Sequence, residues 1–226
     1  SMTRFLRWGL VLVMAVVLIG GCSDDRYSWN QKLTVTVQTP EGEKSGSAVV
    51  QAKTVHAYLL GAGESYLIRI RGEATVVDLG GGKYLFALLQ NKTENLANYV
   101  FTRAGKLKAN KNAWAQLSSR KLRGAEAPVD PELYPMLVTF GDVARPESVM
   151  QVDPANLAAS FGPGYALKAI TLTITDEPVT KGNVVTALPW IKTWPGAFVP
   201  SKLKPADQYE FAEKIGTADF FAGVKP

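Results

Sequence analysis

The strongest fold signal in the chain is the stretch LKAITLTIT at residues 167–175. From Ile170 onward, apolar side chains alternate with threonines, and most of these residues are β-branched. An alternation with a period of two is typical of a β-strand that buries one face and exposes the other. We therefore expect residues 167–175 to form a strand of a sheet whose second face is solvated.

Similar alternation recurs along the chain and predicts further strands. Residues 80–82 are all glycine, and glycines supply the positive φ angles that a tight turn needs, so a hairpin is expected there. The segment 40–47 is rich in Pro, Gly and Ser and is expected to be a turn-rich connection. The further expected strands cover residues 33–38, 66–71, 75–79, 83–89 and 136–140, and another begins at residues 48–51.

Helix signals are fewer and the helices they predict are short. Thr93 is expected to cap a helix over residues 94–104 that ends at Gly105, with Leu96 and Val100 buried and Tyr99 as a further candidate. Other helices are expected at residues 113–122, burying Trp114 and Leu117, from Asp153-Pro154 to Phe161, and at residues 206–215.

Strands dominate this pattern, and strands and helices do not alternate regularly. A regular alternation would indicate parallel strands joined by crossover helices. The sequence therefore predicts a single β-rich α+β domain, with a largely antiparallel sheet and a few short helices.

The first 22 residues have a different composition from the rest. Arg4 and Arg7 precede an unbroken apolar run at residues 10–19, which is followed by Gly20, Gly21 and Cys22. Ten helical residues span about 15 Å, roughly half of a bilayer core, so the run is too short for an ordinary transmembrane helix. The layout is instead that of a secretory signal peptide.

The segment Ile19-Gly20-Gly21-Cys22 resembles the lipobox of bacterial lipoproteins. The resemblance implies that residues 1–21 are removed and that Cys22 carries lipid. The polar residues after Cys22 indicate a short tether, so residues 22–31 are expected to be the lipidated Cys with its tether and 32–226 the globular domain. Two or three acyl chains anchor a protein stably to a membrane. In this family, Ser23 rather than Asp after the Cys leans towards the outer membrane over the inner one.

Three stretches of the mature chain carry a second resemblance. Residues 33–46, 72–89 and 170–182, with Leu188-Pro189-Trp190 shortly after, are similar to segments of proteobacterial envelope proteins to which no activity is assigned. The resemblance implies a shared domain and no particular chemistry.

Composition excludes several functions. With one Cys and one His among 226 residues, the chain can form neither an internal disulfide nor a zinc site of the usual Cys/His kinds. The net charge is +5, and removal of Arg4 and Arg7 with the signal peptide lowers it to +3. That excess does not indicate a nucleic-acid partner, and no cofactor or metal is expected.

The search for catalytic motifs leaves one possibility open. The chain has no Gly-x-Ser-x-Gly segment, and His56 is the only imidazole available to a catalytic triad, although an ordinary structural role is the simpler interpretation. Two acidic pairs, Asp142 with Glu147 and Asp176 with Glu177, could supply the carboxylates of a glycosidase. Acidic residues near strand ends more often cap turns.

Two segments are candidates for binding. Between residues 92 and 123 lie eight basic residues and one acidic residue, Glu94, which suggests contact with anionic lipid or simply a solvated face. The candidate contacts are Lys106, Lys108, Lys111, Arg120, Lys121 and Arg123. Trp190, Trp194 and Phe198 lie on a Pro-rich stretch that could stack on sugars or a partner, or could cover the end of a sheet.

The sequence therefore favours a non-enzymatic lipoprotein, held by Cys22 at the periplasmic face of a membrane, which binds a partner protein or an envelope polymer. One alternative is a cell-wall glycan hydrolase that uses paired carboxylates. The other is a binding module for anionic lipid or lipopolysaccharide.

Overall fold

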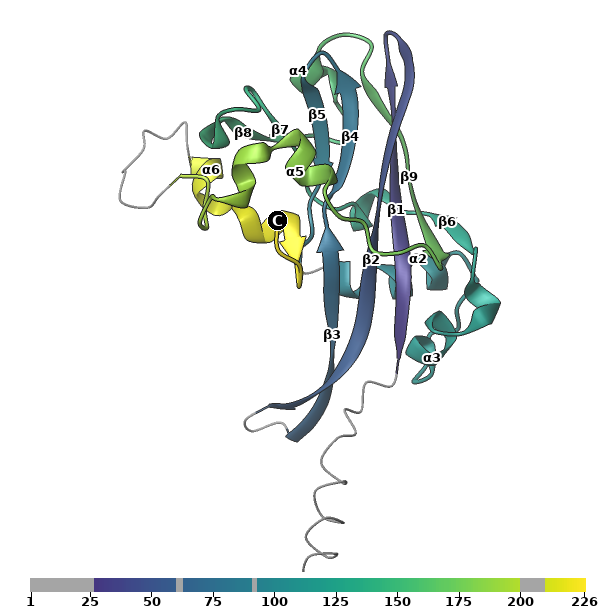
Figure 1. The fold of residues 1–226 in the computed structure, drawn as a ribbon. Coiled ribbons are helices and arrows are strands. Elements are labelled where there is room, and N and C mark those ends of the chain that lie inside the picture. Colours follow the sequence, from purple (N-terminus) through teal and green to yellow (C-terminus); the bar gives the residue numbers. More distant parts are fainter. Residues whose placement is uncertain (1–26, 60–62, 91–92, 200–209) are drawn as a thin grey trace, which may run out of the picture.

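The computed structural model describes residues 27–59, 63–90, 93–199 and 210–226, and these form two β-sheets with short helices around them (Figure 1). The larger sheet has the strand order β10-β3-β2-β1-β9-β6, and the smaller one β4-β5-β7-β8. Neighbouring strands are antiparallel in both sheets. The α+β class with a largely antiparallel sheet is confirmed.

The expected strands are present, together with three short ones that the sequence did not reveal, β6, β8 and β10. The strands are β1 (Ser28–Thr39), β2 (Gly42–Leu59), β3 (Gly63–Glu73), β4 (Thr75–Gly80), β5 (Lys83–Ala87), β6 (Glu126–Pro128), β7 (Leu137–Phe140), β8 (Val149–Val152), β9 (Ala166–Thr175) and β10 (Phe221–Ala222).

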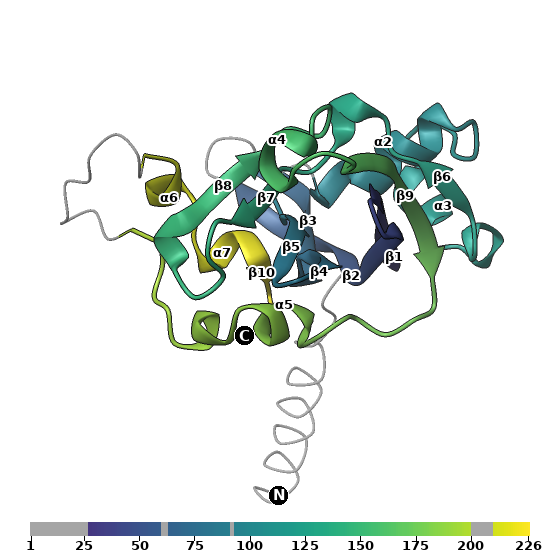
Figure 2. The same ribbon diagram turned by 90° about the horizontal axis from the view of Figure 1, so that it is seen from above.

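The helices are short, and α2 and α5 lie on opposite sides of the sheets (Figure 2). The α-helices are α2 (Leu96–Arg103), α3 (Ala113–Leu117), α4 (Ala158–Phe161), α5 (Asn183–Ala187), α6 (Glu210–Lys214) and α7 (Thr217–Phe220). Single 3-10 turns are η1 (Thr93–Asn95), η2 (Arg120–Leu122), η3 (Pro131–Leu133), η4 (Pro146–Ser148) and η5 (Pro189–Lys192).

The β1–β2 hairpin differs from the expectation at its turn. The turn consists of Pro40 and Glu41 alone, because β1 pairs with β2 from Thr39 opposite Gly42 onward. The prediction of a connection over residues 40–47 was therefore wrong for residues 42–47. Gly46 serves the packing of the two sheets, since a β-carbon there would lie 1.9 Å from the carbonyl oxygen of Val76 in β4.

Strand β1 also begins earlier than expected. It starts at Ser28, so residues 28–31, expected to be part of the tether, belong to the sheet. Trp29 is 3% exposed and its indole N–H donates to Gln31 Oε1 at 2.9 Å. Burial of this pair fixes the start of the strand and leaves residues 23–27 to link it to Cys22.

The glycine hairpin is confirmed. β4 and β5 pair antiparallel, and Gly80, Gly81 and Gly82 are all at positive φ where the chain turns from one strand into the other. The alternation of the two strands places Val77 and Leu85 in the core of the molecule.

The helix at 94–104 is confirmed in place but not in all its details. The helical turn before α2 is η1, and Asn95 rather than Thr93 precedes the first residue of α2. Leu96 and Val100 are buried as expected, whereas Tyr99, the further candidate, is 51% exposed and does not belong to the buried face. Gly105, with a φ of 69°, ends the helix as expected.

Two other helices are shorter than expected because side chains compete with the helical hydrogen bonds. In the segment 113–122, the hydroxyls of Ser118 and Ser119 donate to main-chain carbonyls of α3, and the helix breaks there into α3 and η2. Asp153 accepts the N–H of Ala155 and caps a turn, so α4 begins only at residue 158. Of the helix expected at residues 206–215, α6 (Glu210–Lys214) is present, and residues 206–209 lie outside the described residues.

Candidate functional site

Lipidation was predicted at Cys22, which lies outside the described residues. The distance between Cys22 and the domain is limited by the length of the segment that joins them, because Tyr27 already pairs with β2. The Tyr27 N–H donates to Thr54 Oγ1 at 3.2 Å, and the Thr54 N–H donates to the Tyr27 carbonyl at 2.9 Å. Cys22 therefore lies five residues before a fixed point of the sheet.

The basic side chains predicted to contact an anionic surface are all exposed and lie around α3 and η2. Lys106 donates to the Glu126 carbonyl at 2.5 Å, and Arg123 forms an ion pair with Asp176. The other four form no ion pair with any residue that the structure describes. These four side chains are Lys108, Lys111, Arg120 and Lys121.

A further basic residue of the same segment, Arg103, is held by acidic residues from another part of the chain. Its guanidinium pairs with Asp130 at 2.9 Å and with Glu132. The hydrogen bond to Asp130, followed by that to Glu132, raises the pKa of Arg103. The local excess of positive charge is thus smaller in the structure than in the sequence.

The three aromatic side chains predicted for a binding loop point into the molecule. Phe198 is 1% exposed, and its ring lies 5.1 Å from Trp190 and 5.8 Å from Phe140. The indole of Trp190 donates to the Val143 carbonyl at 2.7 Å, and that of Trp194 to the Ala197 carbonyl at 2.9 Å. These contacts agree with the alternative, that the segment covers the smaller sheet.

The acidic pairs considered for hydrolysis are engaged in turns and ion pairs. Asp142 is exposed and accepts the N–H of Ala144, while Glu147 accepts from Arg145 at 2.9 Å. Asp176 and Glu177 form ion pairs with Arg123 and Lys32 respectively. The only His, His56, packs against Tyr66 with 5.3 Å between ring centroids. None of these side chains lines the cavity described next.

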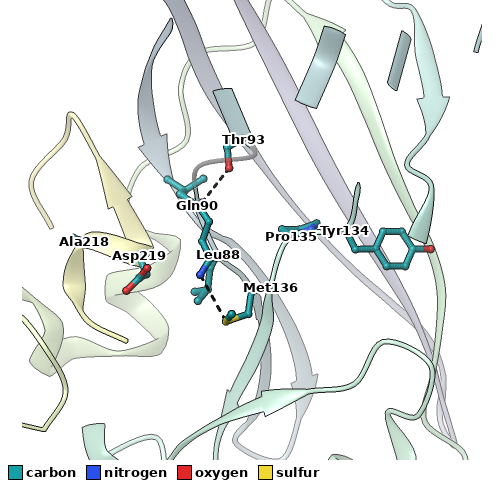
Figure 3. A pocket seen from close by; sticks show the side chains of 9 residues that line it. Leu88, Gln90, Thr93, Tyr134, Pro135, Met136, Ala218 and Asp219 are labelled. Carbon is teal, nitrogen blue, oxygen red and sulfur yellow. Dashed lines mark hydrogen bonds between the residues drawn. The ribbon is translucent and has the colours of Figure 1, made fainter. Parts of the chain in front are cut away.

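A cavity lies where the chain leaves β5, enters β7 and begins α7 (Figure 3). Its volume is about 650 Å³. Its single carboxylate, Asp219, already accepts the Gly216 N–H at 2.9 Å, and the Gln90 amide lies 3.7 Å from the sulfur of Met136. The lining is completed by Leu88, Leu89, Thr93, Tyr134, Pro135 and Ala218.

The structure also contains a buried carboxylate that the sequence interpretation missed. Glu73 is 2% exposed and lies where β3 passes into β4. Its two oxygens accept the N–H groups of Gly182 at 2.9 Å and Asn183 at 2.8 Å, at the start of α5. An acidic residue at the boundary between two strands was the only signal in the sequence.

Known proteins and common site types give no further assignment. Comparisons with models of protein families, with curated proteins and with solved structures find no match to the chain. Within the described ranges, no three His, Cys, Asp or Glu side chains are grouped to hold a metal ion. None of the described helices has the length and apolar character needed to cross a membrane.

Proposed function

We propose that this protein is a bacterial lipoprotein, anchored at the periplasmic face of a membrane through lipid on Cys22, that binds a partner protein or an envelope polymer without catalysing a reaction. The observation that carries the proposal is the segment Ile19-Gly20-Gly21-Cys22, directly after an apolar run of ten residues. Ser23 after the cysteine favours the outer membrane.

The start of the folded domain fits this proposal. β1 begins at Ser28, so few residues separate the lipid-bearing position from the sheet. Five residues span at most about 18 Å when fully extended. The domain is then held close to the membrane surface, where its partner would be another component of the envelope.

The cavity favours binding over hydrolysis. Glycosidases of the common kind use two carboxyl groups on either side of the scissile bond, about 5 to 10 Å apart. Here Asp219 is the only acidic residue among the lining residues, and it caps α7. A cavity of about 650 Å³ is large enough for a side chain or a sugar unit of a binding partner.

The anchor is tested by the variant Cys22→Ser, expressed in a bacterium as the full chain. We expect the parent protein to sediment with membranes and to incorporate radiolabelled palmitate, and the variant to do neither, because a hydroxyl does not accept the lipid. Ser23→Ala is the matched control and should behave like the parent. If the Cys22→Ser variant still incorporates palmitate and sediments with membranes, the proposal is contradicted.

A further inference from the structure

The free end of the β2–β3 hairpin has a solvent face that changes from basic to apolar towards its turn. Along the ladder, Lys53 lies opposite Arg69, and two residues further on Val55 lies opposite Leu67. Residues opposite each other or two apart in a strand share one face of the sheet. Leu67 is 44% exposed, so this part of the face presents apolar surface to solvent.

The other face of the same hairpin is packed against the protein. The Tyr66 ring lies 5.3 Å from His56 and 6.3 Å from Trp114 of α3, and Ile68 is buried. The hairpin therefore has one face packed against the protein, where α3 supports it, and an opposite face on which Leu67 and Arg69 are exposed.

The hairpin extends beyond β1 by the same number of residues that separate β1 from Cys22. From Thr54, the partner of Tyr27, β2 runs five residues further to Leu59, about 17 Å at 3.3 Å per residue. From Tyr27, Cys22 is also five residues away, at most about 18 Å. When the strands stand upright on a membrane, the segment from Tyr27 to Cys22 is too short to hold the domain farther from the bilayer than the hairpin extends. The end of the hairpin therefore reaches the bilayer surface.

Other basic side chains lie at the same end of the molecule. Figure 1 shows α3 beside the lower end of the larger sheet, where β1 begins and the β2–β3 hairpin projects, while β7 and β8 lie towards the upper end. Lys111, just before α3, and Arg120 and Lys121, in η2, are exposed. Each Lys or Arg near an anionic leaflet contributes about 1 kcal/mol of attraction, which corresponds to a factor of about five.

We propose that the hairpin face formed by Val55, Ala57 and Leu67 docks on the anionic leaflet that holds the Cys22 lipid. The apolar residues near the turn enter the interface, and the exposed Arg69 behind them meets the headgroups. The inference rests on the proposed lipid anchor. It adds a second contact that fixes the orientation of the domain on the membrane.

The test uses the lipidated full chain, in which the only native cysteine is blocked by lipid. Leu67→Cys then carries one reactive thiol for a fluorescent label, and Met150→Cys, 42% exposed on β8 at the other end, is the matched control. Both proteins are reconstituted in vesicles of phosphatidylcholine with phosphatidylglycerol and with brominated lipid as quencher. We expect quenching of the label at position 67 and none at position 150.

A charge variant tests the electrostatic part of the proposal. Arg69→Gln in the labelled Leu67→Cys protein should lower the ratio of docked to undocked protein about five-fold, and vesicles of phosphatidylcholine alone should lower it further. Quenching that does not respond to either change would overturn the assignment of an anionic leaflet as the docking surface.

The remaining outcomes separate failure of this inference from failure of the anchor. If both labelled proteins float with the vesicles and neither is quenched, the hairpin does not dock and the inference is overturned while the anchor stands. If position 67 is shielded from iodide but not quenched by brominated lipid, a second copy covers the face, which also overturns it. If neither protein floats, the anchor itself fails, and the docking with it.

Discussion

Replacement of Glu73 by Gln should lower the stability of the domain strongly, although the two side chains have nearly the same size. Each carboxylate oxygen of Glu73 accepts one main-chain N–H, from Gly182 and Asn183, in a site that is 2% exposed. Gln keeps one acceptor and turns the other into an N–H₂ group that faces a donor. One main-chain N–H and one side-chain donor then remain buried without partners.

The magnitude follows from these contacts. A buried polar group left without its partner costs about 1–3 kcal/mol, and hydrogen bonds to a charged group contribute at the upper end of the usual range. We therefore expect a loss of about 3 kcal/mol in the free energy of unfolding. For a protein of this size, 1 kcal/mol lowers the melting temperature by about 2–4 °C, which gives a decrease of about 6–12 °C.

The assay is thermal and urea unfolding followed by circular dichroism, with Glu177→Gln as the matched control. Glu177 is 52% exposed and its ion pair with Lys32 lies on the surface, so its removal should cost at most about 1 kcal/mol. If Glu73→Gln unfolds at the temperature of the parent, or together with Glu177→Gln, then Glu73 does not hold α5 in the way described.

Two further variants test the packing of the sheets. Gly46→Ala places a methyl carbon 1.9 Å from the Val76 carbonyl oxygen and should lower the free energy of unfolding in urea by about 3 kcal/mol. In the control Gly141→Ala the nearest neighbour is 3.7 Å away, and the free energy of unfolding should change by at most about 0.5 kcal/mol. Equal stabilities of the two variants would show that β4 does not cross β2 at Gly46. Phe198→Ala should cost about 3–5 kcal/mol because it opens a cavity in the aromatic cluster, and exposed Tyr99→Ala should cost little. A stable Phe198→Ala protein that has lost partner binding would instead favour a contact role for that side chain.

The strands could be predicted because each has a local pattern. The alternation at residues 167–175 depends only on which side chains face the core, and β9 occupies almost the same residues. The hairpin at residues 80–82 could likewise be predicted, because the positive φ angles of a single turn require glycine there. Such features need no knowledge of distant segments.

The junction of the two sheets could not be predicted because it depends on segments far apart in sequence. Gly46 looked like a turn residue, yet it is required where β4 crosses β2. The partners of Glu73 lie more than a hundred residues away. The inward orientation of Phe198 likewise depends on β7 and α7, which supply Phe140 and Phe220.

Of the candidate contacts, the sequence indicated the charge but not its partners. Arg103 and Arg123 counted towards a basic surface, and the structure pairs them with Asp130 and Asp176. The hairpin face that contains Leu67 was missed because it depends on the pairing of β2 with β3, which the local pattern at residues 66–71 does not show.

The central claim, that Cys22 carries the membrane anchor, is tested most directly by the intact mass of the protein extracted from bacterial membranes. We predict a chain that begins at Cys22, lacks residues 1–21 and carries the added mass of a diacylglyceryl group, with fragmentation locating that mass on the first residue. A membrane-extracted chain with an unmodified Cys22 would contradict the claim.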